Sequence, residues 1–156
     1  MSQKTSDLDQ ALLKLREMYS KELPAKVAPI SQLLQNILIG FSPESSVEIE
    51  KKIHKIAGSA GTYGFSELSN HAGLLEDALT KINTQNLTTF SSQQNTCLAD
   101  WKMWFERIIE QAQQGYTFSP EKYGTAYQDF ESQFISVFKV TARTQRGFQG
   151  GMQDAA

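Results

Sequence analysis

The sequence is poor in the residues that crosslink a chain, bind zinc through sulfur or span a membrane. It has 156 residues and a single cysteine, Cys97, which excludes an internal disulfide and a cysteine-based zinc site. Its most apolar stretch, residues 27–41, is interrupted by serine, glutamine and asparagine and is too short to cross a bilayer. The first ten residues lack the apolar core of a signal peptide. We therefore expect a soluble, cytoplasmic protein that does not contact membranes.

An excess of charge of one sign is also missing. The chain has 15 basic and 17 acidic residues and a net charge of −2, which gives no reason to expect nucleic-acid binding. Hydrophobic residues make up 40% and charged residues 21% of the sequence, as in ordinary globular proteins. The length suits one domain with an appendage.

Alternation of apolar and polar residues is absent as well, so strands are not predicted. Helical spacing is found instead, beginning with apolar residues three or four apart over residues 8–19. Pro24 and Pro29 predict a break or kink, because proline lacks the donor N–H and clashes with the preceding turn. A second apolar set covers residues 30–38, and Ser42, Pro43 and Glu44 have the pattern of a helix start.

Two further helices are expected over about residues 66–82 and 97–112. Short connections between amphipathic helices predict an all-α fold, an antiparallel four-helix bundle with an extra N-terminal helical segment, within residues 1–115. Residues 116–156 form a C-terminal extension with a linker, a helix with an aromatic face and, after Val140, a tail predicted to be disordered. The aromatic face could pack on the bundle, mediate self-association or contact a partner.

The stretch "IEKKIHKIAGSAGTYGF", residues 49–65, places glycines where a helix is still predicted. On a wheel of about 100° per residue, Ile49, Ile53 and Ile56 share the buried side, and His54 points away from it. Gly58 and Gly61 fall on either side of the histidine on its outward face. The glycines thus predict an imidazole beside bare backbone, where another protein can approach closely.

This face has a functional and a structural interpretation. An imidazole with an ordinary pKa of about 6.5 is largely neutral and nucleophilic near pH 7, and Lys51 and Lys55 could stabilise negative charge brought there. Alternatively, the histidine and lysines are an ordinary solvated surface, and Gly61 ends the helix. His71 lies beside core-facing positions of the next helix, and no ligand cluster surrounds either histidine, so no metal site is predicted. No Ser–His–Asp or paired-carboxylate pattern is found.

The stretch "HKIAGSAGTYGFSELSNHAGLLEDAL", residues 54–79, resembles the signature of histidine-containing phosphotransfer (HPt) domains. The features in common are a histidine, a glycine four positions later, small residues, and a second helix with a Leu-Glu pair at residues 75–76. The resemblance covers roughly residues 8–114 and implies that His54 accepts a phosphoryl group, with Lys51, Lys55, Ala57, Gly58 and Gly61 stabilising it or docking a partner. Members of the family often carry a lysine where this chain has Ala57, and Lys51 is the nearest substitute.

The resemblance further implies phosphoryl relay with aspartates of response-regulator receiver domains, below an upstream hybrid sensor kinase. No ATP-binding kinase domain is visible, so the chain would be a relay intermediate rather than a self-sufficient enzyme. It would bind no cofactor itself, and the Mg²⁺ required would come with the receiver domain. A non-catalytic helical adaptor that docks receiver domains without efficient transfer remains the alternative.

Overall fold

The computed structural model describes residues 3–143, and the bundle in it consists of helices alone. Their bounds are α1 Gln3–Ile39, α2 Pro43–Ala60, α3 Ser66–Thr84, α4 Ser92–Gln113 and α5 Ala126–Phe138, with a short 3₁₀ helix, η1, at Pro120–Tyr123. No strand occurs between residues 3 and 143. The prediction of an all-α bundle is confirmed.

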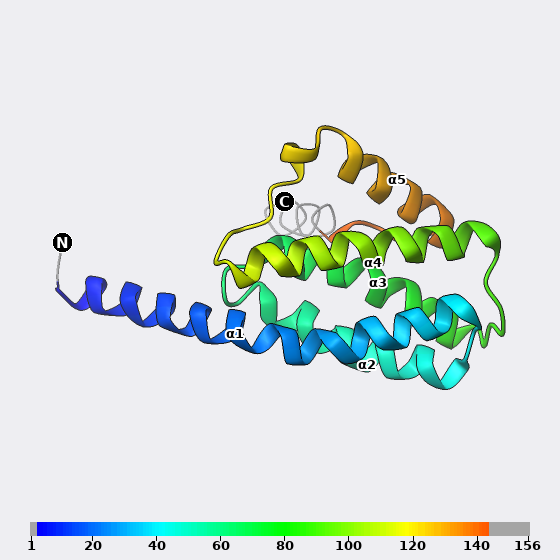
Figure 1. The fold of residues 1–156 in the computed structure, drawn as a ribbon, viewed down its shortest axis with the longest axis horizontal. Coiled ribbons are helices and arrows are strands. Elements are labelled where there is room, and N and C mark those ends of the chain that lie inside the picture. The colour runs from blue at the N-terminus through cyan, green and yellow to red at the C-terminus, as the bar shows by residue number, and fades with distance from the viewer. Residues whose placement is uncertain (1–2, 144–156) are drawn as a thin grey trace, which may run out of the picture.

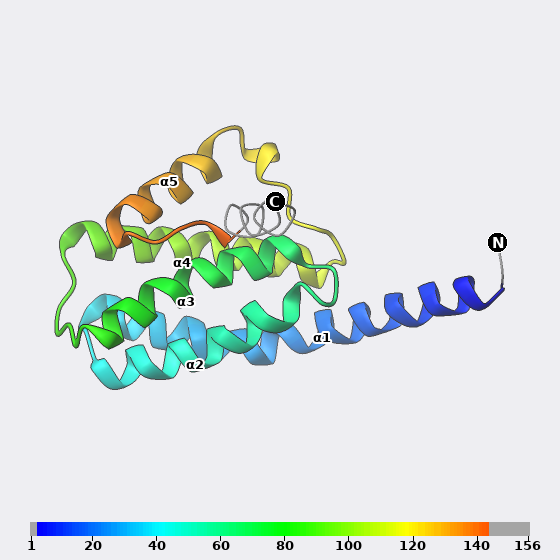
Figure 2. The ribbon, with the colours of Figure 1, turned by 180° about the vertical axis from the view of Figure 1, so that it is seen from behind.

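The first four helices form an antiparallel bundle, and α5 crosses its outer side. Helix α2 packs against α3, α1 against α2 and α4, and α3 against α4 (Figure 1). Helix α5 packs on α4, on the side away from α1 and α2 (Figure 2). Helix α2, which carries His54, therefore lies on the opposite side of the bundle from α5.

Of the break or kink predicted at Pro24 and Pro29, the break does not occur. Both prolines lie inside the continuous, 37-residue helix α1. Each costs about 3 kcal/mol in a helix interior, but Leu23 and Ile30 beside them are fully buried, and burying each such side chain contributes about 1.5–3 kcal/mol. The buried face of α1 also includes Tyr19, Val27, Leu34 and Ile37, and burial of the whole face outweighs the local penalty. The separate N-terminal segment is instead the first part of α1, which projects beyond the bundle (Figure 1).

The start of α2 follows the predicted pattern. Ser42 is the N-cap, its Oγ accepting the Ser45 N–H at 3.3 Å, and Pro43 occupies the first turn. The helix runs through Gly58 and ends at Ala60. In the connection to α3, Gly64 has a φ of +88°, which only glycine adopts without strain. This turn brings α3 back along α2.

A buried polar cluster joins α3, α4 and α5. His71 Nε2 lies 3.0 Å from the Trp101 carbonyl, and Trp101 Nε1 donates to the His71 carbonyl at 2.8 Å. The carbonyl can only accept, so His71 carries its proton on Nε2, and Nδ1 accepts the Tyr127 hydroxyl at 2.8 Å. The two rings of His71 and Trp101 stack 4.6 Å apart. His71 is thus a structural residue of the core.

The aromatic face of the C-terminal extension packs on the bundle. Its buried residues are Tyr127, Phe130, Phe134 and Phe138. This covers the stripe that was considered for self-association. The chain stays ordered beyond Val140: Ala142 is buried and Arg143 pairs with α3. Residues 141–143 of the tail predicted to be disordered thus have defined contacts, and its remainder, residues 144–156, lies outside the described residues.

Candidate functional site

His54 lies on the solvent side of α2, six residues before the end of the helix. Its side chain is 72% exposed, whereas Ile53 and Ile56 beside it are buried in the core. This is the orientation that the helical wheel predicts. The isoleucines fix the rotation of the helix and so hold the imidazole toward solvent.

One nitrogen of the imidazole is bound by a carboxylate of the neighbouring helix. His54 Nδ1 forms a hydrogen bond with Glu76 Oε2 of α3. An ionised carboxylate only accepts hydrogen bonds, so the neutral ring carries its proton on Nδ1. This leaves Nε2 unprotonated, with its lone pair available, and within residues 3–143 nothing hydrogen-bonds to it. When the ring is neutral, this arrangement leaves Nε2 as the nitrogen that can act as a nucleophile.

Glu76 is held on two sides. Its side chain is only 13% exposed, and its second oxygen, Oε1, accepts from Arg143 Nη2 at 2.6 Å. Burial by itself would raise the pKa of Glu76, but the hydrogen bonds from His54 and Arg143 outweigh burial and hold the pKa below its usual value. The carboxylate therefore stays charged at neutral pH and keeps the proton of the imidazole on Nδ1.

Polar contacts between α2 and α3 set the register that brings these two side chains together. Asn83 Nδ2 donates to Glu50 Oε1 at 2.6 Å, and Thr80 Oγ1 donates to Glu50 Oε2 at 3.1 Å, one helical turn before His54. One turn after it, Ser69 Oγ donates to the Ala57 carbonyl at 2.6 Å. The His54–Glu76 contact is thus one step of an antiparallel ladder, which limits how far either side chain can move.

The two glycines predicted to clear the face of His54 have different surroundings. A methyl group at Gly58 would meet no described atom within 4 Å, so the space beside the imidazole is open there. A methyl group at Gly61 would lie 3.6 Å from Ser69 Oγ on α3. Gly61 also has an ordinary helical φ of −63° at the end of α2. Gly58 is therefore the glycine that leaves room for a partner, whereas Gly61 faces α3.

The predicted cationic residues lie one helical turn apart on α2. Lys51 and Lys55 are exposed, and neither forms an ion pair within the described part of the chain. Lys55 lines an open groove of about 410 Å³ between α1 and α2, together with Lys26 and Lys52. Ala57 is only 7% exposed, and its side chain has no polar group that could bind a phosphoryl group. The cation that hydrogen bonds link to the imidazole is Arg143: Glu76 binds His54 through one oxygen and Arg143 through the other.

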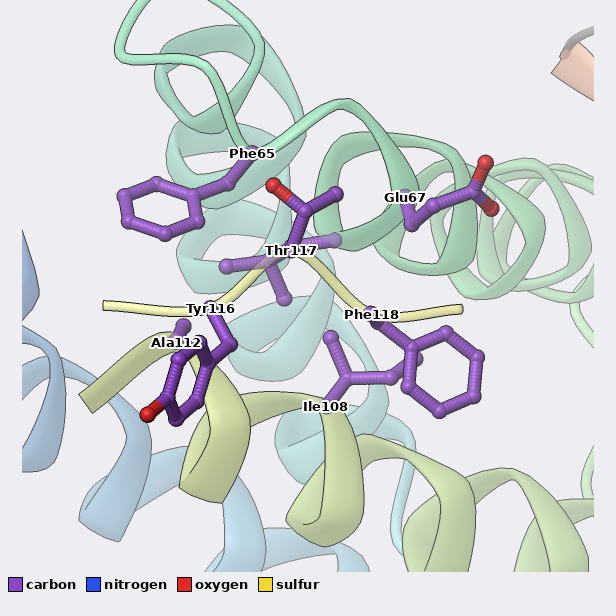
Figure 3. Close-up of a pocket in the computed structure, with 8 residues that line it drawn as sticks. Phe65, Glu67, Ile108, Ala112, Tyr116, Thr117 and Phe118 are labelled. Carbon is purple, nitrogen blue, oxygen red and sulfur yellow. The ribbon is translucent and has the colours of Figure 1, made fainter. Parts of the chain in front are cut away.

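A hollow elsewhere in the described part of the chain is too small for a ligand. Figure 3 shows Phe65, Ile108, Thr117 and Phe118 converging on a hollow below the turn between α2 and α3, which has no room for a water molecule. Among residues 3–143, no group of three or more histidine, cysteine or acidic side chains could hold a metal ion. Over the same residues, no helix is long and apolar enough to cross a membrane. The exposed imidazole is thus the candidate site.

Comparison with protein families identifies this architecture. A family model described as the Hpt domain matches residues 14–115, which is most of the four-helix bundle and includes His54 and Glu76. The chain belongs to the Hpt domain family. Hpt domains function in phosphotransfer within phosphorelay signalling and interact with receiver domains. Comparison with curated proteins and with solved structures gave no match.

Two residues of this Hpt site were not singled out as site residues from the sequence. Glu76 belongs to the Leu-Glu pair of the resemblance, but its contact with His54 depends on the register of α2 and α3. Arg143 lies in a segment predicted to be disordered, 67 residues from its partner Glu76. Gly73 is the feature of the sequence that could have indicated the contact of Arg143 with Glu76, because the local structure of α3 does not require a glycine there.

Proposed function

We propose that the protein is a phosphorelay intermediate in which His54 accepts a phosphoryl group from the aspartate of a receiver domain. The observation that carries the proposal is the hydrogen bond between His54 Nδ1 and Glu76, on a ring that is 72% exposed. It holds the proton on one nitrogen and directs the lone pair of the other toward solvent. His54 lines none of the hollows described above, so we expect a partner protein to deliver the phosphoryl group.

The transfer requires little of the bundle beyond alignment. The Nε2 lone pair attacks phosphorus in line, the bond from phosphorus to the aspartyl oxygen breaks, and the aspartate leaves as a carboxylate. The ring then carries the phosphoryl group on Nε2 and its original proton on Nδ1, and is positively charged. Glu76 stabilises this charge through the same hydrogen bond, as a carboxylate does for the histidine of a catalytic triad. Reversal of these steps transfers the group to a second receiver.

The partner supplies what the chain lacks. We expect Mg²⁺ to enter with the acidic pocket of the receiver domain, and the phosphoryl group to originate from an upstream hybrid sensor kinase. Lys51 and Lys55 would attract the acidic receiver surface, and relay requires that the complex dissociate quickly. These assignments rest on the family and on the charges around His54.

The direct experiment is phosphorylation by a receiver domain. A receiver carrying radiolabelled phosphate on its aspartate is mixed with the full chain and Mg²⁺, and the products are separated by electrophoresis. We expect label on this chain that is stable to base and lost in acid, as phosphohistidine is, and located by peptide mapping at His54. If the protein binds several phosphorylated receivers and never acquires label, it is an adaptor and not a relay protein.

Gly58→Ala should make the protein more stable and a poorer phosphoryl acceptor. Gly58 lies within α2 and a methyl group there meets no described atom, so alanine should raise the free energy of unfolding by about 1 kcal/mol. The same methyl group lies beside His54, where the receiver must close, and should slow transfer severalfold. Urea unfolding and the labelling rate measure the two effects.

The matched control is Gly40→Ala, which also adds a methyl group into open space, in the connection between α1 and α2. It should leave the labelling rate unchanged. A Gly58→Ala protein that is labelled as fast as the wild type would show that the glycine serves no docking role.

A further inference from the structure

The segment that follows α5 runs back along α3 toward the candidate site. Lys139, with a φ of +56°, ends α5, and its carbonyl accepts a hydrogen bond from Lys81 of α3. Ala142 is buried, and Arg143 reaches residues 73–77 of α3. Figure 2 shows this stretch after α5 crossing the bundle. The contacts proceed from Lys81 to Asp77 and then to Gly73, so the segment is antiparallel to α3.

Arg143 is bound by two carboxylates at once. Its Nε donates to Asp77 Oδ2 at 3.2 Å, and its Nη2 donates to Asp77 Oδ1 at 2.9 Å and to Glu76 Oε1 at 2.6 Å. The pair with Asp77 is bidentate, which fixes the direction of the guanidinium as well as its position. These hydrogen bonds raise the pKa of Arg143 above its usual value, with Asp77 as the largest cause. The guanidinium thus stays charged and oriented.

Gly73 makes this approach possible. A methyl group at position 73 would lie 2.6 Å from Arg143 Cγ and 2.7 Å from Arg143 Nε, closer than such atoms can be. A glycine inside a helix costs about 1 kcal/mol relative to alanine, and here its missing side chain is the space that Arg143 occupies. Gly73, Glu76 and Asp77 lie three and four residues apart, on one face of α3. Together Gly73, Glu76 and Asp77 form the binding site of the Arg143 side chain, which we call the Arg143 seat.

From these contacts we infer that Arg143 is a positioning residue for phosphoryl transfer: it anchors the Glu76 carboxylate that holds the phosphoacceptor His54. One oxygen of Glu76 binds Arg143 and the other binds the imidazole, so the rotamer of Glu76 depends on both partners. The C-terminal extension, which lies outside the part of the chain that matches the family, thereby controls the site. This inference rests on the proposed function of His54 and assigns a role in it to the extension.

Loss of Arg143 should release Glu76 without removing it. A freed carboxylate populates other rotamers, and the imidazole then returns toward the tautomer favoured in water, with its proton on Nε2. A proton on Nε2 blocks the lone pair that must attack phosphorus. The effect should therefore be visible in the tautomer of His54 before any phosphoryl group is added.

The test uses the full chain and two variants that displace the guanidinium in different ways. Arg143→Gln removes the charge, and Gly73→Ala keeps every charge but fills the seat. Nitrogen chemical shifts of His54 report the tautomer, and the labelling rate from a phosphorylated receiver reports transfer. In both variants we expect a smaller fraction of the Nδ1–H tautomer and a labelling rate lower by about 3- to 10-fold, the equivalent of one anchoring hydrogen bond.

The control is Arg107→Gln, which removes the same charge from α4, where Arg107 lies over the rings of Trp104 and Tyr123. It should change neither measurement. If both test variants keep the wild-type tautomer and rate, Arg143 is only a structural clamp and the inference is wrong. If Arg143→Gln does not fold, Gly73→Ala decides alone. A wild type that is never labelled would overturn the proposed function, and the tautomer would still test the link from Arg143 to His54.

Discussion

His54→Gln should lose phosphoryl transfer almost completely and keep its fold. The amide of glutamine has no nucleophilic lone pair to replace Nε2, so the labelling rate should fall on the order of 1,000-fold or more. The side chain is exposed, and the glutamine amide can still donate a hydrogen bond to Glu76, so the free energy of unfolding should change by no more than about 0.5 kcal/mol. Labelling by a phosphorylated receiver and urea unfolding measure the two quantities.

The second histidine of the chain provides the control. His71 is fully buried among Trp101, Phe105 and Tyr127 and cannot meet a receiver domain. His71→Gln should therefore still be labelled, once the rate is corrected for the folded fraction. Undiminished labelling of His54→Gln would by itself place the phosphoacceptor elsewhere and refute the proposed function.

Mild acid should destabilise the protein strongly, chiefly through His71. Burial, only partly opposed by the hydrogen bond to the Trp101 carbonyl, lowers the pKa of His71 to about 3, whereas the unfolded chain has the ordinary pKa of 6.5. Between these values the unfolded chain binds a proton at His71 and the folded protein does not, so the free energy of unfolding falls as the pH falls. From pH 6.5 to 4.5 the loss should be about 2.3 kcal/mol, because the unfolded histidine is half protonated at pH 6.5 and the slope approaches 1.36 kcal/mol per pH unit only at lower pH.

Comparison with His71→Gln isolates this contribution. Glutamine does not titrate, and it can donate to the Trp101 carbonyl and accept from Tyr127, so the variant should be less stable at pH 6.5 but lose less stability on acidification. Glu67 and Glu131, whose pKa values are raised chiefly by burial, oppose the effect of His71 equally in both proteins. Urea unfolding at three pH values, followed by tryptophan fluorescence, gives both slopes. Equal slopes would contradict the assignment.

The sequence predicts well those features that depend on residues close together in the chain. The N-cap at Ser42 and the outward direction of His54 both follow from spacing within a single helix. The continuity of α1 through Pro24 and Pro29 could not be predicted in this way, because the packing that stabilises it comes from other helices. A local penalty is visible in a sequence, whereas the burial that offsets it is not.

The same distinction applies to the site. The outward direction of His54 and the open space at Gly58 could be predicted, since both lie on one face of α2. Glu76 and Arg143 could not, because their roles arise from the register of α2 with α3 and from the path of a segment with few apolar residues. The segment is held by the ion pairs of Arg143 with Glu76 and Asp77 and by the space that Gly73 leaves for the arginine. A hydrophobicity pattern shows neither feature.

The shared carboxylate of Glu76 has a further consequence, in the thermodynamics of the whole chain. Coupling between two binding events is reciprocal, so whatever free energy the docked Arg143 contributes to the state of His54, the state of His54 returns to the docking of Arg143. In the proposed mechanism, phosphorylation places a positive charge on the ring, and this charge strengthens the hydrogen bond from His54 Nδ1 to Glu76. The phosphorylated and unphosphorylated proteins should then hold their C-terminal segments with different strength, and the extension would report the phosphorylation state to any protein that reads it.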